Sequence, residues 1–108
     1  EKTRLKDFVK SKKHGIDTII GENGFSLSGG QQQRLGIARG LYKDVNFLLL
    51  DEATNALDLS TEREILKNIT SSYKDLTLLM ITHRKENLDF CNRIFKIIDG
   101  NLNEISNK

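Results

Sequence analysis

The sequence predicts an α/β fold in which mostly parallel strands are flanked by helices and followed by a C-terminal β-hairpin. Two short apolar runs, residues 45–50 and 76–81, are separated by a segment whose apolar residues recur at helical spacing. This order of strand, helix and strand is a βαβ unit, and its two strands are parallel neighbours. An Asp-Gly pair at 99–100, between the strand-like segments 93–98 and 101–105, is a strong signal for a two-residue hairpin turn.

Length and composition limit the possible functions. A chain of 108 residues has the size of one domain, and we divide it into a helical segment, 1–44, and an α/β core segment, 45–108. No apolar run is long enough for a transmembrane helix, and the first residues do not lead into a signal peptide. The single cysteine, Cys91, excludes an internal disulfide and a cysteine-cluster metal site. A net charge of +2 is too balanced to indicate a nucleic-acid partner.

Two helices are predicted in the helical segment. The first falls within the basic stretch 3–14, where apolar residues are one turn apart, and Gly15 is placed to end it. The charges of this stretch fit either a solvated face or a binding patch. A glycine-rich loop over 21–30 leads to the second helix, which begins after Ser28 and ends near Asp44. Its apolar stripe consists of Leu35, Ala38, Leu41 and Tyr42.

The core segment holds the βαβ unit. Its first strand, 45–50, is a continuous apolar run, which is typical of a strand buried on both faces of a parallel sheet. Ser60 is placed to cap the following helix, whose first turn over 62–64 is rich in negative charge. The inner face of this helix consists of Ile65, Leu66, Ile69 and Tyr73. After the second strand, 76–81, a short helix is predicted over 86–90.

Polar side chains follow both strands of this unit. Asp51 and Glu52 come directly after the first strand, and Thr82 and His83 after the second. Parallel strands end at the same edge of a sheet, so we expect these side chains to converge. An aspartate there suits Mg²⁺, a glutamate can orient or deprotonate a water, and a histidine can donate to a phosphoryl oxygen. The alternative is a polar loop and a surface histidine without chemistry.

A second candidate site lies at the start of the second helix. Ser28, Gly29, Gly30 and Gln31 lie at a helix N-terminus, where free backbone N–H groups and the helix dipole attract anions. The glycines allow a phosphate to approach without a Cβ in the way. Taken alone, the same residues fit a flexible helix cap.

Together these residues resemble the C-terminal part of an ATP-binding-cassette (ABC) ATPase domain, which has a P-loop NTPase-like fold. Leu27 to Gln31 match the signature motif of that family, and Phe47 to Glu52 resemble its Walker B strand. Asn55 to Asp58 resemble the D-loop, which usually begins with Ser, and His83 stands where the switch histidine follows its strand. All four elements occur in the order of the family, and the resemblance extends from about residue 5 to residue 106.

Three features are similar to the exporter type of this family. Ala53 follows the Walker B acids, where many importers have Pro, and residues 18–24 resemble the exporter X-loop. That resemblance implies that Glu22 contacts the transmembrane part of a transporter, although Asn23 replaces the usual Arg. The third feature is the run of residues 82–84, Thr-His-Arg. The chain is therefore interpreted as part of a nucleotide-binding domain that couples ATP hydrolysis to transport, on the cytoplasmic face of a membrane.

The resemblance also implies partners, cofactors and roles. Family members act as pairs of nucleotide-binding domains, attached to a transmembrane domain. Ser28 to Gln31 would contact ATP held by the second nucleotide-binding domain. On their own side, Asp51 would serve Mg²⁺, while Glu52 and His83 would be catalytic. Asp58 would lie at the interface between the domains.

One family element is absent from the sequence. No Gly-x-x-x-x-Gly-Lys-[Ser/Thr] P-loop occurs in the 108 residues. We therefore expect a fragment, cut from a parent ATP hydrolase, that is inactive by itself and holds neither ATP nor Mg²⁺ tightly. The P-loop strand normally neighbours the Walker B strand, so its loss predicts an unpaired strand edge and self-association. Two alternatives are a fragment of a non-transport ABC ATPase, of the chromosome-maintenance, repair or translation-factor type, and a free-standing interaction module.

Overall fold

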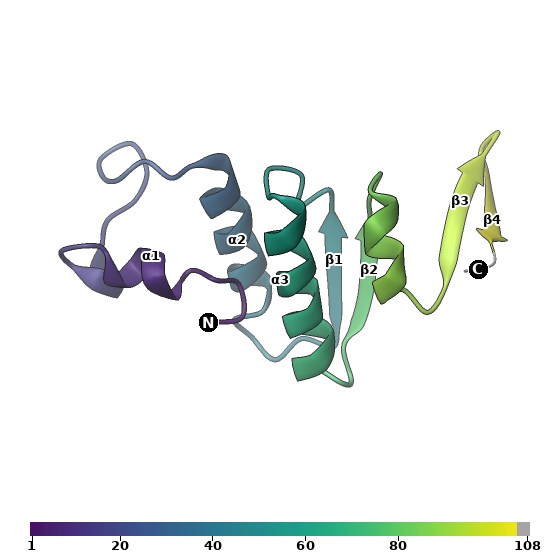
Figure 1. Ribbon diagram of the computed structural model, residues 1–108, viewed down its shortest axis with the longest axis horizontal. Coiled ribbons are helices and arrows are strands. Elements are labelled where there is room, and N and C mark those ends of the chain that lie inside the picture. Colours follow the sequence, from purple (N-terminus) through teal and green to yellow (C-terminus); the bar gives the residue numbers. More distant parts are fainter. Residues whose placement is uncertain (106–108) are drawn as a thin grey trace.

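The computed structural model describes residues 1–105 and has the predicted α/β architecture (Figure 1). Its helices and strands follow the order α1 (Lys6–Lys10), α2 (Gly29–Gly40), β1 (Phe47–Asp51), α3 (Leu59–Ser72), β2 (Thr77–Ile81), β3 (Ile94–Ile98) and β4 (Asn101–Ile105), with short 3₁₀ helices η1 (Gly15–Asp17) and η2 (Lys85–Phe90). The described chain is elongated, because the helical segment and the β3–β4 hairpin lie at opposite ends of the βαβ unit (Figure 1).

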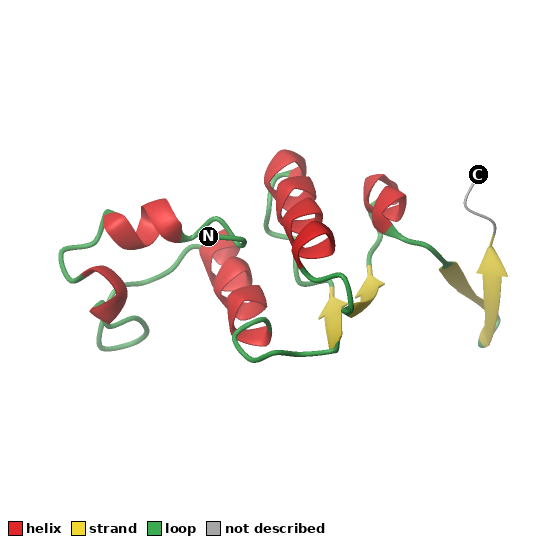
Figure 2. Cartoon of the chain, turned by 90° about the horizontal axis from the view of Figure 1, so that it is seen from below, coloured by secondary structure: helices red, strands yellow, loops and turns green. Residues whose placement is uncertain are grey.

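The βαβ unit is confirmed. Strands β1 and β2 pair in parallel, with Leu48 opposite Leu78 and Leu50 opposite Met80. Helix α3 covers one face of this pair (Figure 2). The core lies between them, and it consists of Ile37 from α2, Leu48 and Leu50 from β1, Leu57, and Ile65, Leu66 and Ile69 from α3. Ile65, Leu66 and Ile69 are fully buried, as predicted for the inner face of this helix. Tyr73, the fourth predicted residue, is the C-cap of α3 and is partly buried against the core.

The prediction that the first strand is buried on both faces is wrong for the described residues. Leu48 and Leu50 point to α3, but Phe47 and Leu49 on the other face of β1 are 56% and 50% exposed. Leu79 and Ile81 of β2 continue this uncovered face at 49% and 48% exposure. Side chains alternate between the two faces of a strand, and within residues 1–105 the buried core, with α3 and Ile37 of α2, lies on the face of Leu48 and Leu50. A continuous apolar run therefore does not by itself reveal what covers the second face.

The helical segment departs from its prediction in its boundaries. Helix α1 is confirmed, but it ends at Lys10 with Ser11 as its C-cap, so Gly15 begins η1 instead of ending α1. Helix α2 ends at Gly40, earlier than Asp44. The stripe predicted for it is partly wrong, because Tyr42 is 87% exposed whereas Ile37 faces the core at 2% exposure.

The N-terminus of α2 is capped as predicted. The Ser28 hydroxyl accepts a hydrogen bond from the Gln31 N–H at 3.2 Å, and the Gln31 Oε1 accepts one from the Ser28 N–H at 2.9 Å. This reciprocal pair is a capping box, in which two N–H groups that the helix leaves without partners are satisfied. The start of α2 is therefore determined by local sequence.

Helix α3 begins two residues earlier than predicted. Asp58, not Ser60, is its N-cap: one Asp58 carboxylate oxygen accepts the Thr61 N–H at 2.9 Å, and the Ser60 hydroxyl donates to the same oxygen. Both residue types favour this position, but the ionised Asp58 accepts more strongly than a hydroxyl. The hydrogen bonds from Ser60 and then from Thr61 hold the pKa of the Asp58 carboxyl well below its usual value.

The hairpin is also confirmed. Ile98 pairs with Asn101 across a two-residue turn, in which Asp99 and Gly100 both have positive φ, 49° and 77°. The boundary that we place at 44/45 lies in the connection between α2 and β1, and the division into two segments stays a prediction. Among the helices of the described residues, none is both long enough and apolar enough to cross a membrane.

Candidate functional site

The two strand ends do converge. Asp51 is the last residue of β1 and is exposed, and the Glu52 N–H donates to the carbonyl oxygen of Ile81 at 3.1 Å, just beyond the paired residues. His83 Nε2 lies 2.8 Å from Glu52 Oε1. The predicted carboxylate and imidazole therefore meet at the carboxyl edge of the parallel pair, although they are far apart in the sequence.

Glu52 has an unusual backbone conformation. Its φ is +47°, a region that residues other than Gly seldom occupy. A backbone conformation of this kind persists only where surrounding contacts hold it, and residues that adopt it are often found at functional positions. The other carboxylate oxygen, Oε2, accepts a hydrogen bond from the Asn55 side-chain amide at 2.9 Å. Both oxygens of Glu52 thus have a partner, and the carboxylate is oriented from two sides.

The site is open to solvent. The side chain of Glu52 is 41% exposed and that of His83 is 87% exposed. The pair therefore forms a solvent-accessible edge that the described residues do not enclose.

The start of α2 packs closely against the loop that follows β1. A Cβ added to Gly30 would lie 3.3 Å from the backbone oxygen of Ala56 and from Leu57 Cδ2, and one added to Gly29 would lie 3.4 Å from Ala56 Cβ. The Ala56 N–H also donates to Gln33 Oε1 at 2.8 Å. The signature-like residues are therefore joined to residues 55–58, so these glycines have a packing role besides any role in binding an anion.

A buried polar network that the sequence does not predict lies behind this edge. Glu62 on α3 is fully buried and accepts hydrogen bonds from the Thr54 hydroxyl, the Asn87 side-chain amide at 2.7 Å and the Arg84 guanidinium. The sequence predicts Glu62 only as a member of an acidic first turn. A signal was present, because Glu62 stands at i, i+3, i+4 and i+7 with Ile65, Leu66 and Ile69, on the buried stripe of the helix.

Glu22 does not join this site. Glu22 is exposed and belongs to the turn over 21–24. The segment between η1 and α2, which contains this turn, lies on the far side of α2 from the sheet (Figure 1). The turn is closed by a hydrogen bond from the Phe25 N–H to the Ile19 carbonyl oxygen at 2.8 Å. It requires Gly24, because a Cβ there would lie 2.2 Å from that same oxygen. Two separate surfaces therefore carry the predicted residues.

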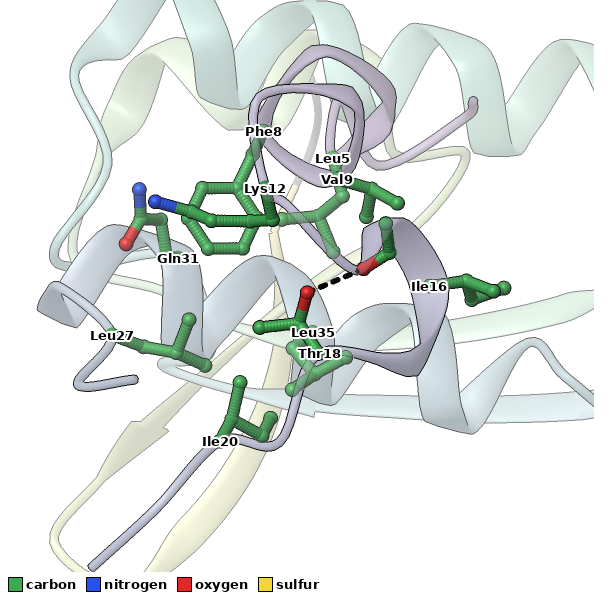
Figure 3. A pocket seen from close by; sticks show the side chains of 11 residues that line it. Leu5, Phe8, Val9, Lys12, Ile16, Thr18, Ile20, Leu27, Gln31 and Leu35 are labelled. Atoms are coloured by element: carbon green, nitrogen blue, oxygen red, sulfur yellow. Dashed lines mark hydrogen bonds between the residues drawn. The ribbon is translucent and has the colours of Figure 1, made fainter. Parts of the chain in front are cut away.

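A pocket that the sequence did not predict lies between α1, η1 and α2. Figure 3 shows the largely apolar side chains around it, among them Phe8, Ile16 and Leu35, and its volume is about 150 Å³. The Thr18 hydroxyl donates to the Gly15 carbonyl oxygen at 2.7 Å and closes one side.

The fold and the site define a class, the ATPase domains in which a signature helix precedes a Walker B strand. A family model described as "ABC transporter" matches residues 2–55, half of the chain. The chain belongs to this family, as the sequence motifs indicated. It is 46% identical over 101 residues to an ATP-dependent lipid A-core flippase of Pectobacterium atrosepticum, and 48% identical over 98 residues to the flippase of the same name from Photobacterium profundum.

These alignments cover 94% and 91% of this chain but only 17% of each flippase. Among solved structures, a bacterial Atm1-family ABC exporter with ATP bound is similar, with a TM-score of 0.82 and 38% sequence identity. That match covers 92% of this chain and 17% of the exporter chain. The chain therefore spans about one sixth of the relatives that it matches, and the predicted fold class is confirmed.

Proposed function

We propose that this chain is part of the nucleotide-binding domain of an ABC exporter, which couples ATP hydrolysis to transport across a membrane. The single observation that carries the proposal is the contact between Glu52 and His83, 2.8 Å apart at the ends of two parallel strands. The matched flippases and the matched exporter are all transporters by name, which favours this function over a non-transport ABC ATPase. In the family, this domain lies on the cytoplasmic side of the membrane.

The donor groups at the sheet edge fit Mg²⁺. The exposed carboxylate of Asp51 ends β1, and it offers the hard oxygen that Mg²⁺ prefers. Mg²⁺ takes one or two carboxylates and completes its shell with water and substrate phosphates, so a single aspartate at an open edge is sufficient. When bound, the ion supplies charge neutralisation on the phosphates of ATP.

Glu52 and His83 then have complementary tasks. Glu52 orients the attacking water and accepts its proton, as a general base within hydrogen-bond reach. When ATP is bound, His83 Nε2 donates to the phosphoryl group as negative charge gathers on it, in place of its contact with Glu52. Phosphoryl transfer depends mainly on positioning and electrostatics, which fits a site whose carboxylate is oriented from two sides.

The remaining candidates act between domains. Ser28, Gly29, Gly30 and Gln31 contact the ATP of a second nucleotide-binding domain through the N-terminus of α2. Asp58 lines the interface between the two domains. Glu22, on the opposite surface, contacts the transmembrane domain.

The test of catalysis uses the complete gene product in lipid vesicles. Glu52→Gln keeps the size of the side chain and removes the base, so ATP hydrolysis is expected to fall by at least about 100-fold. Glu64→Gln is the matched control, because Glu64 is a half-exposed residue of α3 whose ion pair with Arg4 lies on the surface. Equal rates for wild type and Glu52→Gln would refute the proposal.

The isolated chain provides a second test. It has no P-loop motif among its 108 residues, so little in it can hold the β- and γ-phosphates. Calorimetry is expected to show very weak binding of Mg·ATP. A micromolar dissociation constant that Asp51→Ala abolishes would contradict this.

A further inference from the structure

A buried carboxylate lies directly behind the candidate site. Glu62 has no exposed surface, and a glutamate is seldom buried unless other groups compensate its charge. Here Thr54, Asn87 and Arg84 all donate to it, and Thr54 and Asn87 are buried themselves. Glu62 therefore joins the loop after β1 to the loop after β2 through α3.

The Arg84 guanidinium makes two further contacts. Its Nη1 donates to the carbonyl oxygen of Leu57 at 3.0 Å, and its Nη2 donates to the carbonyl oxygen of Asn55, also at 3.0 Å. A guanidinium is rigid, planar and permanently charged, so it can serve several acceptors at once in a fixed geometry. Arg84, which is paired with Glu62, therefore holds two carbonyl groups of the loop over 55–57.

This loop leads straight to the catalytic carboxylate. The backbone of Asn55 is held by Arg84, and its side-chain amide donates to Glu52 Oε2 at 2.9 Å. Glu52 Oε1 contacts His83, the residue that precedes Arg84. Glu52 is thus held from two directions in a closed circuit of four residues, which are Arg84, Asn55, Glu52 and His83.

We propose that Arg84 is a positioning residue for ATP hydrolysis: supported by the buried Glu62, it holds Asn55 so that the Glu52 carboxylate keeps its orientation. This inference rests on the proposed function, because it assigns a task within the same site. Arg84 does not touch the reacting atoms, and it acts through Asn55. Its other effect is to make the loop over 55–57 move together with His83.

A simple structural tie between α3 and η2 is the competing explanation, and the chain contains a control for it. Arg63, next to Glu62 on α3, donates to the Glu86 carbonyl oxygen and to the Asp89 carboxylate at 3.3 Å. It joins the same two elements on the surface, and no hydrogen bond of the described residues connects its side chain to the loop over 55–57. Arg63→Gln therefore removes this surface connection between α3 and η2 and leaves the contacts among Arg84, Asn55, Glu52 and His83 intact.

The experiment measures kcat and KM for ATP, together with Tm, in the complete gene product reconstituted in lipid vesicles. Arg84→Lys keeps the charge beside Glu62 but replaces the two Nη donors by one ammonium, so at least one carbonyl contact is lost. We expect kcat to fall about tenfold, with KM within about twofold of wild type. Arg63→Gln is expected to keep both constants and to lower Tm only slightly, because its ion pair with Asp89 lies on the surface.

A double variant tests the route through Asn55. Asn55→Ala removes the amide that contacts Glu52, and we expect it to lower kcat by a similar factor. If Arg84 acts through Asn55, the kcat of the double variant Asn55→Ala/Arg84→Lys is little lower than that of either single variant. The kcat of Asn55→Ala/Arg63→Gln is then the product expected for independent substitutions.

Three results would overturn the inference. The first is an unchanged kcat in Arg84→Lys, and the second is a fall of kcat in Arg63→Gln equal to that in Arg84→Lys. The third is a kcat of Asn55→Ala/Arg84→Lys that falls by the product of the two single effects. A failure of the proposed function is distinguishable, because wild type would then hydrolyse ATP no faster than Glu52→Gln.

Discussion

The close approach of α2 to the loop after β1 predicts opposite effects for one substitution at two positions of the same helix. Gly36 is in the exposed middle of α2, and a Cβ added there meets no heavy atom within 4 Å. Glycine in a helix interior costs about 0.5–1 kcal/mol relative to alanine. Gly36→Ala should therefore raise the free energy of unfolding by about that amount.

Gly30→Ala brings at most the same gain in helix propensity, but its Cβ meets two atoms at 3.3 Å. One of them, the backbone oxygen of Ala56, cannot move freely, because the Ala56 N–H is bonded to Gln33 and both neighbouring carbonyls are bonded to Arg84. Overpacking of this kind costs about 1–3 kcal/mol. We therefore expect the two variants to differ in unfolding free energy by at least about 1 kcal/mol, with Gly36→Ala the more stable.

The assay is urea unfolding of the purified chain, followed by circular dichroism and extrapolated to water, at a concentration at which light scattering shows a monomer. Equal slopes for the two variants would show that the comparison reports stability and not a change in compactness. The reasoning is refuted if the two free energies agree within about 0.3 kcal/mol, because the loop over 55–57 would then yield to the new methyl group without cost.

Two further predictions concern charge and association. Hydrogen bonds from Ser60 and Thr61 lower the pKa of Asp58 in the folded chain, so the stabilisation that its carboxylate provides is present above the unfolded value near 3.8 and is lost as the pH falls below it. An asparagine at position 58 cannot take up that proton. The helical circular dichroism of Asp58→Asn should therefore decline less than that of wild type from about pH 5 to about pH 2. Parallel curves for the two proteins would show that the Asp58 cap does not cause the loss of stability in acid. The uncovered face and open edge of β1 predict that the isolated chain self-associates, which light scattering measures. Leu49→Lys should reduce the association, and a wild-type chain that stays monomeric at high concentration would contradict it.

Local signals account for the parts of the fold that were predicted correctly. The cap of α2 depends on Ser28 and Gln31, three residues apart, and the hairpin depends on Asp99 and Gly100, which are adjacent. Such features use backbone hydrogen bonds within a few positions, so a single sequence reveals them. Where two good local candidates compete, the sequence is ambiguous: both Asp58 and Ser60 suit an N-cap, and the structure uses Asp58.

The candidate site was predictable only in part. Topology was enough to bring Asp51, Glu52 and His83 to one edge, because parallel strands end on the same side of a sheet. It did not reveal that Asn55 contacts Glu52, nor that Arg84 contacts the backbone of this loop. Those contacts join side chains to backbone atoms of other loops, and they follow from the tertiary arrangement rather than from any local pattern.

By itself, the sequence determined the class of fold, the order of its elements and the family, because apolar periodicity, helix caps, turn residues and motif spacing are all encoded locally. Only the tertiary structure decided which face of β1 is covered, how close Gly30 comes to the next loop, and why Glu62 is buried. The physical reason is that burial depends on which elements pack together. A carboxylate on the apolar stripe of α3 becomes stable only where Thr54, Arg84 and Asn87 converge on it from two loops far apart in the chain.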